Sequence, residues 1–171
     1  MVRLDWDRTA IPLRLRGFYP LHIAPEPGWP FGRKGLALAG AWRQLGTPAA
    51  AGMLILDGDV AADPLDLAAM LAAIHADPAV IHTAPVRLWP VSTKLDGWVW
   101  SHGRGQFTQQ DVDDPDLFGF SFTYLPRRLI EGAGLDRLTY PGVDRQVMSV
   151  AQKMRIPVRL VRGARPVHLN Y

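Results

Sequence analysis

The sequence predicts a three-layer α/β/α fold with a mostly parallel β-sheet. Short apolar runs bounded by glycine, proline or aspartate are typical of buried strands. Longer apolar segments that begin at capping residues and end at glycine or proline indicate helices. The two kinds of segment alternate along the chain, which favours helices covering both faces of one sheet. The chain has 171 residues, of which 48% are hydrophobic, so we expect residues 1–171 to form a single compact domain.

The N-terminal segment, residues 1–30, is the least regular part of this pattern. Apolar and charged residues alternate over 13–16 as in an edge strand, and 18–24 is a second candidate strand. Residues 25–30 contain three prolines and predict a loop. We therefore expect an atypical entry into the fold.

Clearer elements follow this segment. Residues 34–45 predict a helix, and the apolar run 52–56 predicts a buried strand. Asp63 is a favourable N-cap and Pro64 suits the first helical position, so 65–75 is predicted to be helical. The remaining predictions are helices over 127–132 and 144–154, and strands over 80–84, 98–100, 118–125, 156–161 and 167–169.

Two carboxylates stand directly after the predicted strand 52–56. Asp57 and Asp59 are separated only by Gly58, which predicts a turn. A carboxylate at the end of a buried strand costs desolvation unless a positive charge meets it. Hard divalent cations prefer oxygen ligands, so the pair indicates a metal site. The alternative is an ordinary solvated Asp-Gly turn.

The motifs around this turn have a recognisable order. Gly32-Arg33-Lys34-Gly35 opens the helix before the strand, and Asp63-Pro64 opens the helix after it. Three further segments follow: 117–136 contains several glycines and ends in Asp136, 143–147 contains Asp144, and 165–169 contains His168. This order resembles the metal-binding core of GT-A fold glycosyltransferases, in particular glycosyltransferase family 2, over roughly residues 30–170. The resemblance implies that the family's first nucleotide-binding unit is trimmed here.

The resemblance implies a site for a nucleotide-sugar donor and for Mn²⁺ or Mg²⁺. Asp59 would bind the metal directly, and Asp57 would bind it through water or hold the ribose. His168 would be a third ligand, although a lone histidine on a late strand is equally well explained by packing.

Three further residues are candidates for donor contacts. Arg33 and Lys34 lie where a helix N-terminus attracts anions, so they would contact the diphosphate or the base. Trp29 would stack on the nucleobase. Its position beside prolines also fits a hydrophobic plug.

Asp144 is the candidate general base implied by the same family. An inverting transferase needs a carboxylate that takes the proton of the acceptor hydroxyl. At the start of a helix the dipole favours the ionised carboxylate. The alternative role for Asp144 is a helix N-cap without chemistry.

The resemblance therefore implies a metal-dependent glycosyltransferase that uses a UDP- or GDP-linked sugar and is inverting. The alternatives are a degenerate GT-A domain that binds nucleotide-sugar or saccharide without turnover, and a nucleotidyltransferase. The sequence does not distinguish between four classes of acceptor: a saccharide, a lipid carrier, a protein and modified DNA. Self-association into a homo-oligomer is also left open.

Composition narrows the cellular setting. The sequence has no cysteine, which excludes disulfides and a cysteine nucleophile. Every apolar run is interrupted well before the roughly 20 residues that a membrane span requires. We therefore expect no transmembrane segment and a cytoplasmic protein.

Overall fold

The computed structural model describes residues 34–45, 49–58, 60–89, 99–100, 107–108, 119–138 and 142–169. Its helices are α2 (Lys34–Leu45), α3 (Pro64–Ala76), α4 (Arg127–Ala133), α5 (Val143–Lys153) and the short 3-10 helix η2 (Leu135–Arg137). Its strands are β1 (Gly52–Leu56), β2 (Val60–Ala61), β3 (Ile81–Thr83), β4 (Arg87–Trp89), β5 (Val99–Trp100), β6 (Phe107–Thr108), β7 (Phe122–Pro126), β8 (Val158–Leu160) and β9 (Val167–Leu169).

The predicted helices and strands that fall on described residues are confirmed, with ends that move by a few residues. The candidate strands 13–16 and 18–24 lie outside the described residues. The elements that sequence reasoning missed are short: β2, β4, β6 and η2 have two or three residues each. Such lengths are below what hydrophobic periodicity can resolve.

The main sheet has four described strands in the order β1-β7-β3-β8. Strand β7 is antiparallel to both β1 and β3, and only the β3–β8 pair is parallel. The prediction of a mostly parallel sheet was therefore wrong. Parallel neighbours require a crossover, usually a helix, but the described residues between β3 and β7 carry the strands β4, β5 and β6.

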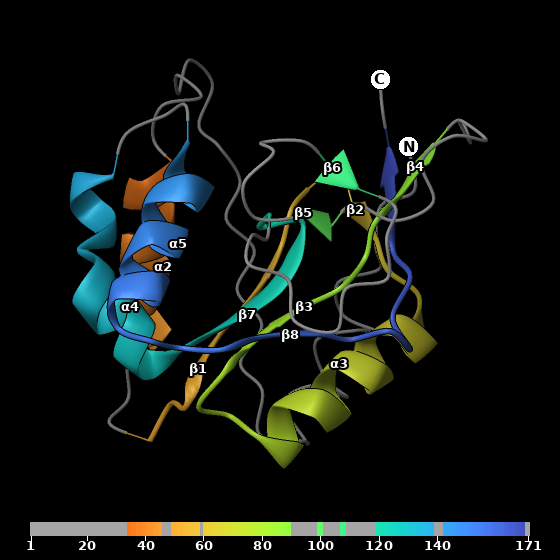
Figure 1. Ribbon diagram of the computed structural model, residues 1–171, viewed down its shortest axis with the longest axis horizontal. Coiled ribbons are helices and arrows are strands. Elements are labelled where there is room, and N and C mark those ends of the chain that lie inside the picture. Colours follow the sequence, from red (N-terminus) through yellow and green to blue (C-terminus); the bar gives the residue numbers. More distant parts are fainter. Residues whose placement is uncertain are drawn as a thin grey trace.

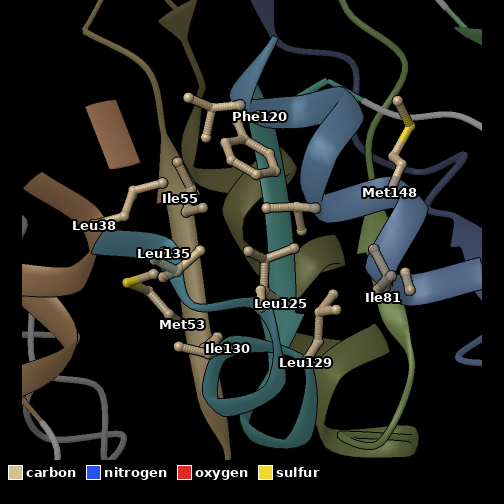
Figure 2. Close-up of a cluster of buried hydrophobic side chains, with 14 of the residues drawn as sticks. Leu38, Met53, Ile55, Ile81, Phe120, Leu125, Leu129, Ile130, Leu135 and Met148 are labelled. Carbon is tan, nitrogen blue, oxygen red and sulfur yellow. The ribbon is translucent and has the colours of Figure 1, made fainter. Parts of the chain in front are cut away.

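Helices cover both faces of this sheet, as Figure 1 shows, with α2, α4 and α5 on one side and α3 on the other. Met53 and Ile55 of β1 point to the first side and pack in one core cluster with Leu125 of β7. Figure 2 shows this cluster, with Leu38 of α2 beside β1 and Met148 of α5 at the far side. The α/β/α layering is thus confirmed for the described elements.

A second cluster fills the opposite face, beneath α3. Met70, Leu71 and Ile74 of α3 pack there with Phe122 and Tyr124 of β7. Because side chains alternate between the two faces of a strand, β7 contributes Leu125 to the first cluster and its neighbour Tyr124 to the second. Every residue of β7 is buried, as expected for a central strand with helices on both sides.

A smaller sheet has three strands in the order β2-β9-β4, and its two outer strands directly follow main-sheet strands in the sequence. Strand β2 follows β1 after a short turn, and β4 follows β3. Strand β9 lies between them and pairs Val60 with His168. The carboxyl ends of β1 and β3 are therefore both followed by strands that β9 joins.

Candidate functional site

The candidate site begins at the carboxyl end of β1, where Asp57 follows the last strand residue. The Asp57 N–H donates to the carbonyl of Ser121 at 3.1 Å, and the Asp57 carbonyl accepts from the Val60 N–H at 3.0 Å. The first bond extends the β1–β7 ladder, and the second closes the turn into β2. Both backbone groups of Asp57 are thereby held, so its carboxylate projects from a fixed point.

Lys34 of α2 meets this carboxylate. Its Nζ atom lies 2.9 Å from Oδ1 and 2.9 Å from Oδ2 of Asp57. The two side chains are 30% and 27% exposed, so water still reaches the pair. The structure therefore brings together two residues that the sequence analysis assigned separately to donor binding.

Gly35 allows α2 to lie close enough for this contact. A Cβ atom at Gly35 would be 2.5 Å from the carbonyl oxygen of Leu135 and 3.0 Å from that of Leu138. Both neighbours are backbone atoms, which side-chain rotation cannot move aside. The start of α2 is therefore pressed against η2, and Lys34 stands at that point of contact.

Phe120 forms the buried wall of the site. Its side chain is fully buried in the first core cluster, and the Lys34 Nζ lies 5.3 Å from the centre of its ring. At that distance the ring quadrupole attracts the ammonium. In Figure 2 Phe120 lies at the end of the cluster opposite Ile130 and Leu129.

Asp144 of α5 contacts the backbone of Phe120. Its Oδ2 atom accepts the Phe120 N–H at 3.2 Å, although the two residues are 24 positions apart. The N-cap of α5 is Gly142, and Asp144 is in the first turn. Asp144 is therefore not the N-cap of this helix, and its carboxylate points to the segment before β7.

Two buried threonines hold that segment, which consists of Gly119, Phe120 and Ser121. The hydroxyl of Thr123 donates to the Gly119 carbonyl at 2.6 Å. Its oxygen is 2.8 Å from the Thr83 hydroxyl. Since Thr123 already uses its proton, Thr83 must be the donor in this second bond. The chain of bonds fixes Phe120 between Asp57 and Asp144.

His168 approaches the site from β9. Its register partner is Val60, which closes the turn that begins at Asp57. The segment before β9 is tied to α3, because the Arg165 N–H donates to the buried carboxylate of Asp66 at 2.6 Å. Asp66 also accepts the Asp63 N–H at 3.0 Å and so completes a capping box.

Three predicted site residues, Trp29, Arg33 and Asp59, lie outside the described residues. Within the described ranges, no three acidic, histidine or cysteine side chains gather as a metal-binding group. Asp57 offers the oxygen ligands that Mg²⁺ and Mn²⁺ prefer. Both of its carboxylate oxygens are contacted by the Lys34 ammonium. A metal would have to share or take that position.

Sequence reasoning missed Phe120 and Thr123 as parts of the site. In the sequence both are ordinary residues of an apolar strand. Their contacts with Asp144, Lys34 and Thr83 join positions at least 24 residues apart, which no local pattern indicates. The only local signal was Gly119, a small residue immediately before the strand.

No family model matches the chain, and no curated protein gives a significant match. Among solved structures, A197 from STIV superposes with a TM-score of 0.53 at 15% sequence identity. The match covers 81% of this chain and 66% of that one, so the chain spans slightly less than two thirds of A197. At this identity the likeness concerns the fold alone. Among the described residues, no helix is long and apolar enough to cross a membrane.

Proposed function

We propose that this chain is a metal-dependent glycosyltransferase of the GT-A type, acting on a UDP- or GDP-linked sugar with inversion. One observation carries the proposal: Asp57, Lys34 and Asp144 come from three different elements and meet around Phe120. They do so at the carboxyl end of β1. Ligands of open α/β sheets bind at the carboxyl ends of strands, near a change in strand order.

The donor side of the site consists of Asp57 and Lys34. A diphosphate carries negative charge, which Lys34 would neutralise directly. Asp57, together with Asp59 and His168, would hold Mn²⁺ or Mg²⁺, a cation that neutralises charge on the leaving diphosphate. The carboxylate of Asp57 is suited to this role because its backbone is fixed on both sides.

The acceptor side consists of Asp144. The acceptor oxygen attacks the anomeric carbon, and the bond from that carbon to the diphosphate oxygen breaks with its electrons passing to the diphosphate. The acceptor hydroxyl gives its proton to the Asp144 carboxylate. The first turn of α5 favours the ionised carboxylate, and the Phe120 N–H orients it through Oδ2.

A second candidate is a nucleotide-sugar-binding domain without turnover. The observation in its favour is the Lys34–Asp57 contact, which places an ammonium where the metal would bind. A nucleotidyltransferase has no comparable observation in its support.

The experiment is incubation of the protein with a panel of UDP- and GDP-sugars and Mn²⁺, followed by measurement of free UDP and GDP. The proposal predicts release that a chelator abolishes and that Asp144→Asn reduces strongly. Donor binding in the same panel without any release would favour the binding domain. If the protein neither binds nor cleaves any donor in the panel, both candidates are refuted.

A further inference from the structure

The ammonium of Lys34 occupies the position of a chelated cation. Its Nζ atom is equidistant, at 2.9 Å, from the two carboxylate oxygens of Asp57. Mn²⁺ or Mg²⁺ would use the same two carboxylate oxygens of Asp57 that this ammonium contacts. The fully buried Phe120 ring lies 5.3 Å from Nζ and closes one side of this position.

Two cations do not fit at this position together. A unit charge and a double charge a few ångströms apart repel each other strongly in a partly buried site. Lysine has a flexible four-carbon stem, so its ammonium moves by several ångströms without any shift of the helix that carries it. Gly35 fixes α2 against η2, which leaves the Lys34 side chain as the part that moves.

We propose that Lys34 is a tethered counter-cation, which competes with the divalent metal for Asp57 and passes to the donor diphosphate when the metal binds. The inference rests on the proposed function, because it uses the same metal and donor. It assigns Lys34 two successive partners. In the free protein it neutralises Asp57. In the loaded site Lys34 would leave the Asp57 carboxylate to the metal and would add its own charge to the diphosphate.

The competition predicts an order of metal affinities among variants at one position. Lys34→Gln removes the competing charge and keeps a polar side chain of similar length. Lys34→Arg replaces the ammonium by a planar fork that binds a carboxylate through two parallel hydrogen bonds. Mn²⁺ should therefore bind most tightly to Lys34→Gln, less tightly to the unchanged protein, and least tightly to Lys34→Arg.

A matched control lies at the other end of the sheet. Arg159 contacts Asp77 at 3.2 Å, which is also an ion pair between a basic residue and an aspartate. Asp77 precedes β3, whereas Asp57 follows β1, and these two strands run in the same direction on either side of β7. Arg159→Gln removes one positive charge far from the site and should leave Mn²⁺ affinity unchanged.

The test is direct titration of the full chain with Mn²⁺ alone, followed by titration with UDP and GDP at saturating Mn²⁺. We expect Lys34→Gln to bind Mn²⁺ about two- to fivefold more tightly than the unchanged protein, as removal of a partly exposed ion-pair charge suggests. We expect the same variant to bind the nucleotide about tenfold more weakly, because the diphosphate loses a charge-assisted contact.

Each other result overturns a stated part of the inference. Equal Mn²⁺ affinity in Lys34→Gln and the unchanged protein overturns the competition, even if the protein transfers sugar. Unchanged nucleotide affinity in Lys34→Gln overturns the second role of Lys34. No Mn²⁺ binding by any variant overturns both the competition and the metal part of the proposed function. The expected affinity order in a protein that releases no nucleotide would refute the proposed turnover alone.

Discussion

Asp144 and Phe120 are joined by a hydrogen bond of 3.2 Å from the Phe120 N–H to the Asp144 carboxylate. The bond connects the first turn of α5 to the segment that precedes β7. The same segment accepts the Asp57 N–H through Ser121, so the candidate base and the candidate donor site share one backbone support. Asp57 is attached to this support through its backbone N–H, so a change of its carboxylate leaves that bond in place, whereas a change of the Asp144 carboxylate alters the bond to Phe120.

Asp144→Asn should retain the fold and donor binding and lose transfer. An amide oxygen still accepts the Phe120 N–H, but an amide does not accept a proton at neutral pH. Removal of a general base lowers turnover by about 10²- to 10⁴-fold. Nucleotide release tests the loss of transfer, and UDP affinity measured on the same preparation tests the retained donor binding. Near-normal release by Asp144→Asn would leave Asp144 with a supporting role only.

Gly35→Ala should destabilise the protein by about 1–3 kcal/mol, the usual cost of overpacking. Its Cβ would lie 2.5 Å from a backbone oxygen of η2. Gly40→Ala in the same helix is the matched control, because a Cβ there meets nothing within 4 Å. The control should gain about 0.5–1 kcal/mol from better helix propensity. Urea unfolding of the two variants would show opposite shifts, and equal shifts would refute the close α2–η2 contact.

Asp66→Ala should cost more than Asp63→Ala, although both residues belong to one capping box. Asp63 serves only its own helix, for which a cap substitution costs about 1 kcal/mol. Asp66 also accepts the Arg165 N–H from a segment 99 positions away, and loss of a hydrogen bond to a charged group adds about 1.5–3 kcal/mol. Thermal unfolding of both variants measures the difference. Equal costs would show that the Asp66–Arg165 contact contributes nothing.

Tyr124 should make stability fall at high pH. Burial raises the pKa of Tyr124 to about 12, against an ordinary value near 10. Above pH 10 the unfolded chain releases this proton and the folded chain keeps it, so the free energy of unfolding decreases between pH 10 and 12. Below pH 10 the protonated Tyr124 hydroxyl makes its full contribution to the free energy of unfolding.

The matched variant is Tyr124→Phe, which also removes the hydrogen bond from the Tyr124 hydroxyl to the Pro78 carbonyl at 3.0 Å. Between pH 9 and 11 the unchanged protein should lose about 1 kcal/mol more unfolding free energy than Tyr124→Phe. Parallel pH profiles for the two proteins would contradict this role for Tyr124.

The elements that local chemistry specifies could be predicted from the sequence. Asp63 and Pro64 mark the start of α3 because one caps orphan N–H groups and the other has a preset φ. The apolar run 52–56 became β1. The direction of β7 could not be predicted in this way, since strand pairing depends on partners distant in the chain.

The candidate site was predictable in part. Lys34 and Asp57 were each assigned to the donor from their local motifs, but the contact between them depends on how α2 packs beside β1. Asp144 was placed correctly near a helix start, whereas its bond to Phe120 is a tertiary contact. No local pattern marks Phe120, because a phenylalanine before a buried strand is ordinary core composition.

We propose that Asp57 belongs to a metal-dependent site for a nucleotide diphosphate. The decisive experiment is calorimetric titration of UDP and GDP, with and without Mn²⁺, into Asp57→Asn and Asp77→Asn. Both variants neutralise an aspartate that is paired with a basic side chain, at opposite ends of the sheet. We predict that Mn²⁺-dependent nucleotide binding is lost in Asp57→Asn and retained in Asp77→Asn. Unchanged Mn²⁺-dependent binding in Asp57→Asn would contradict the claim.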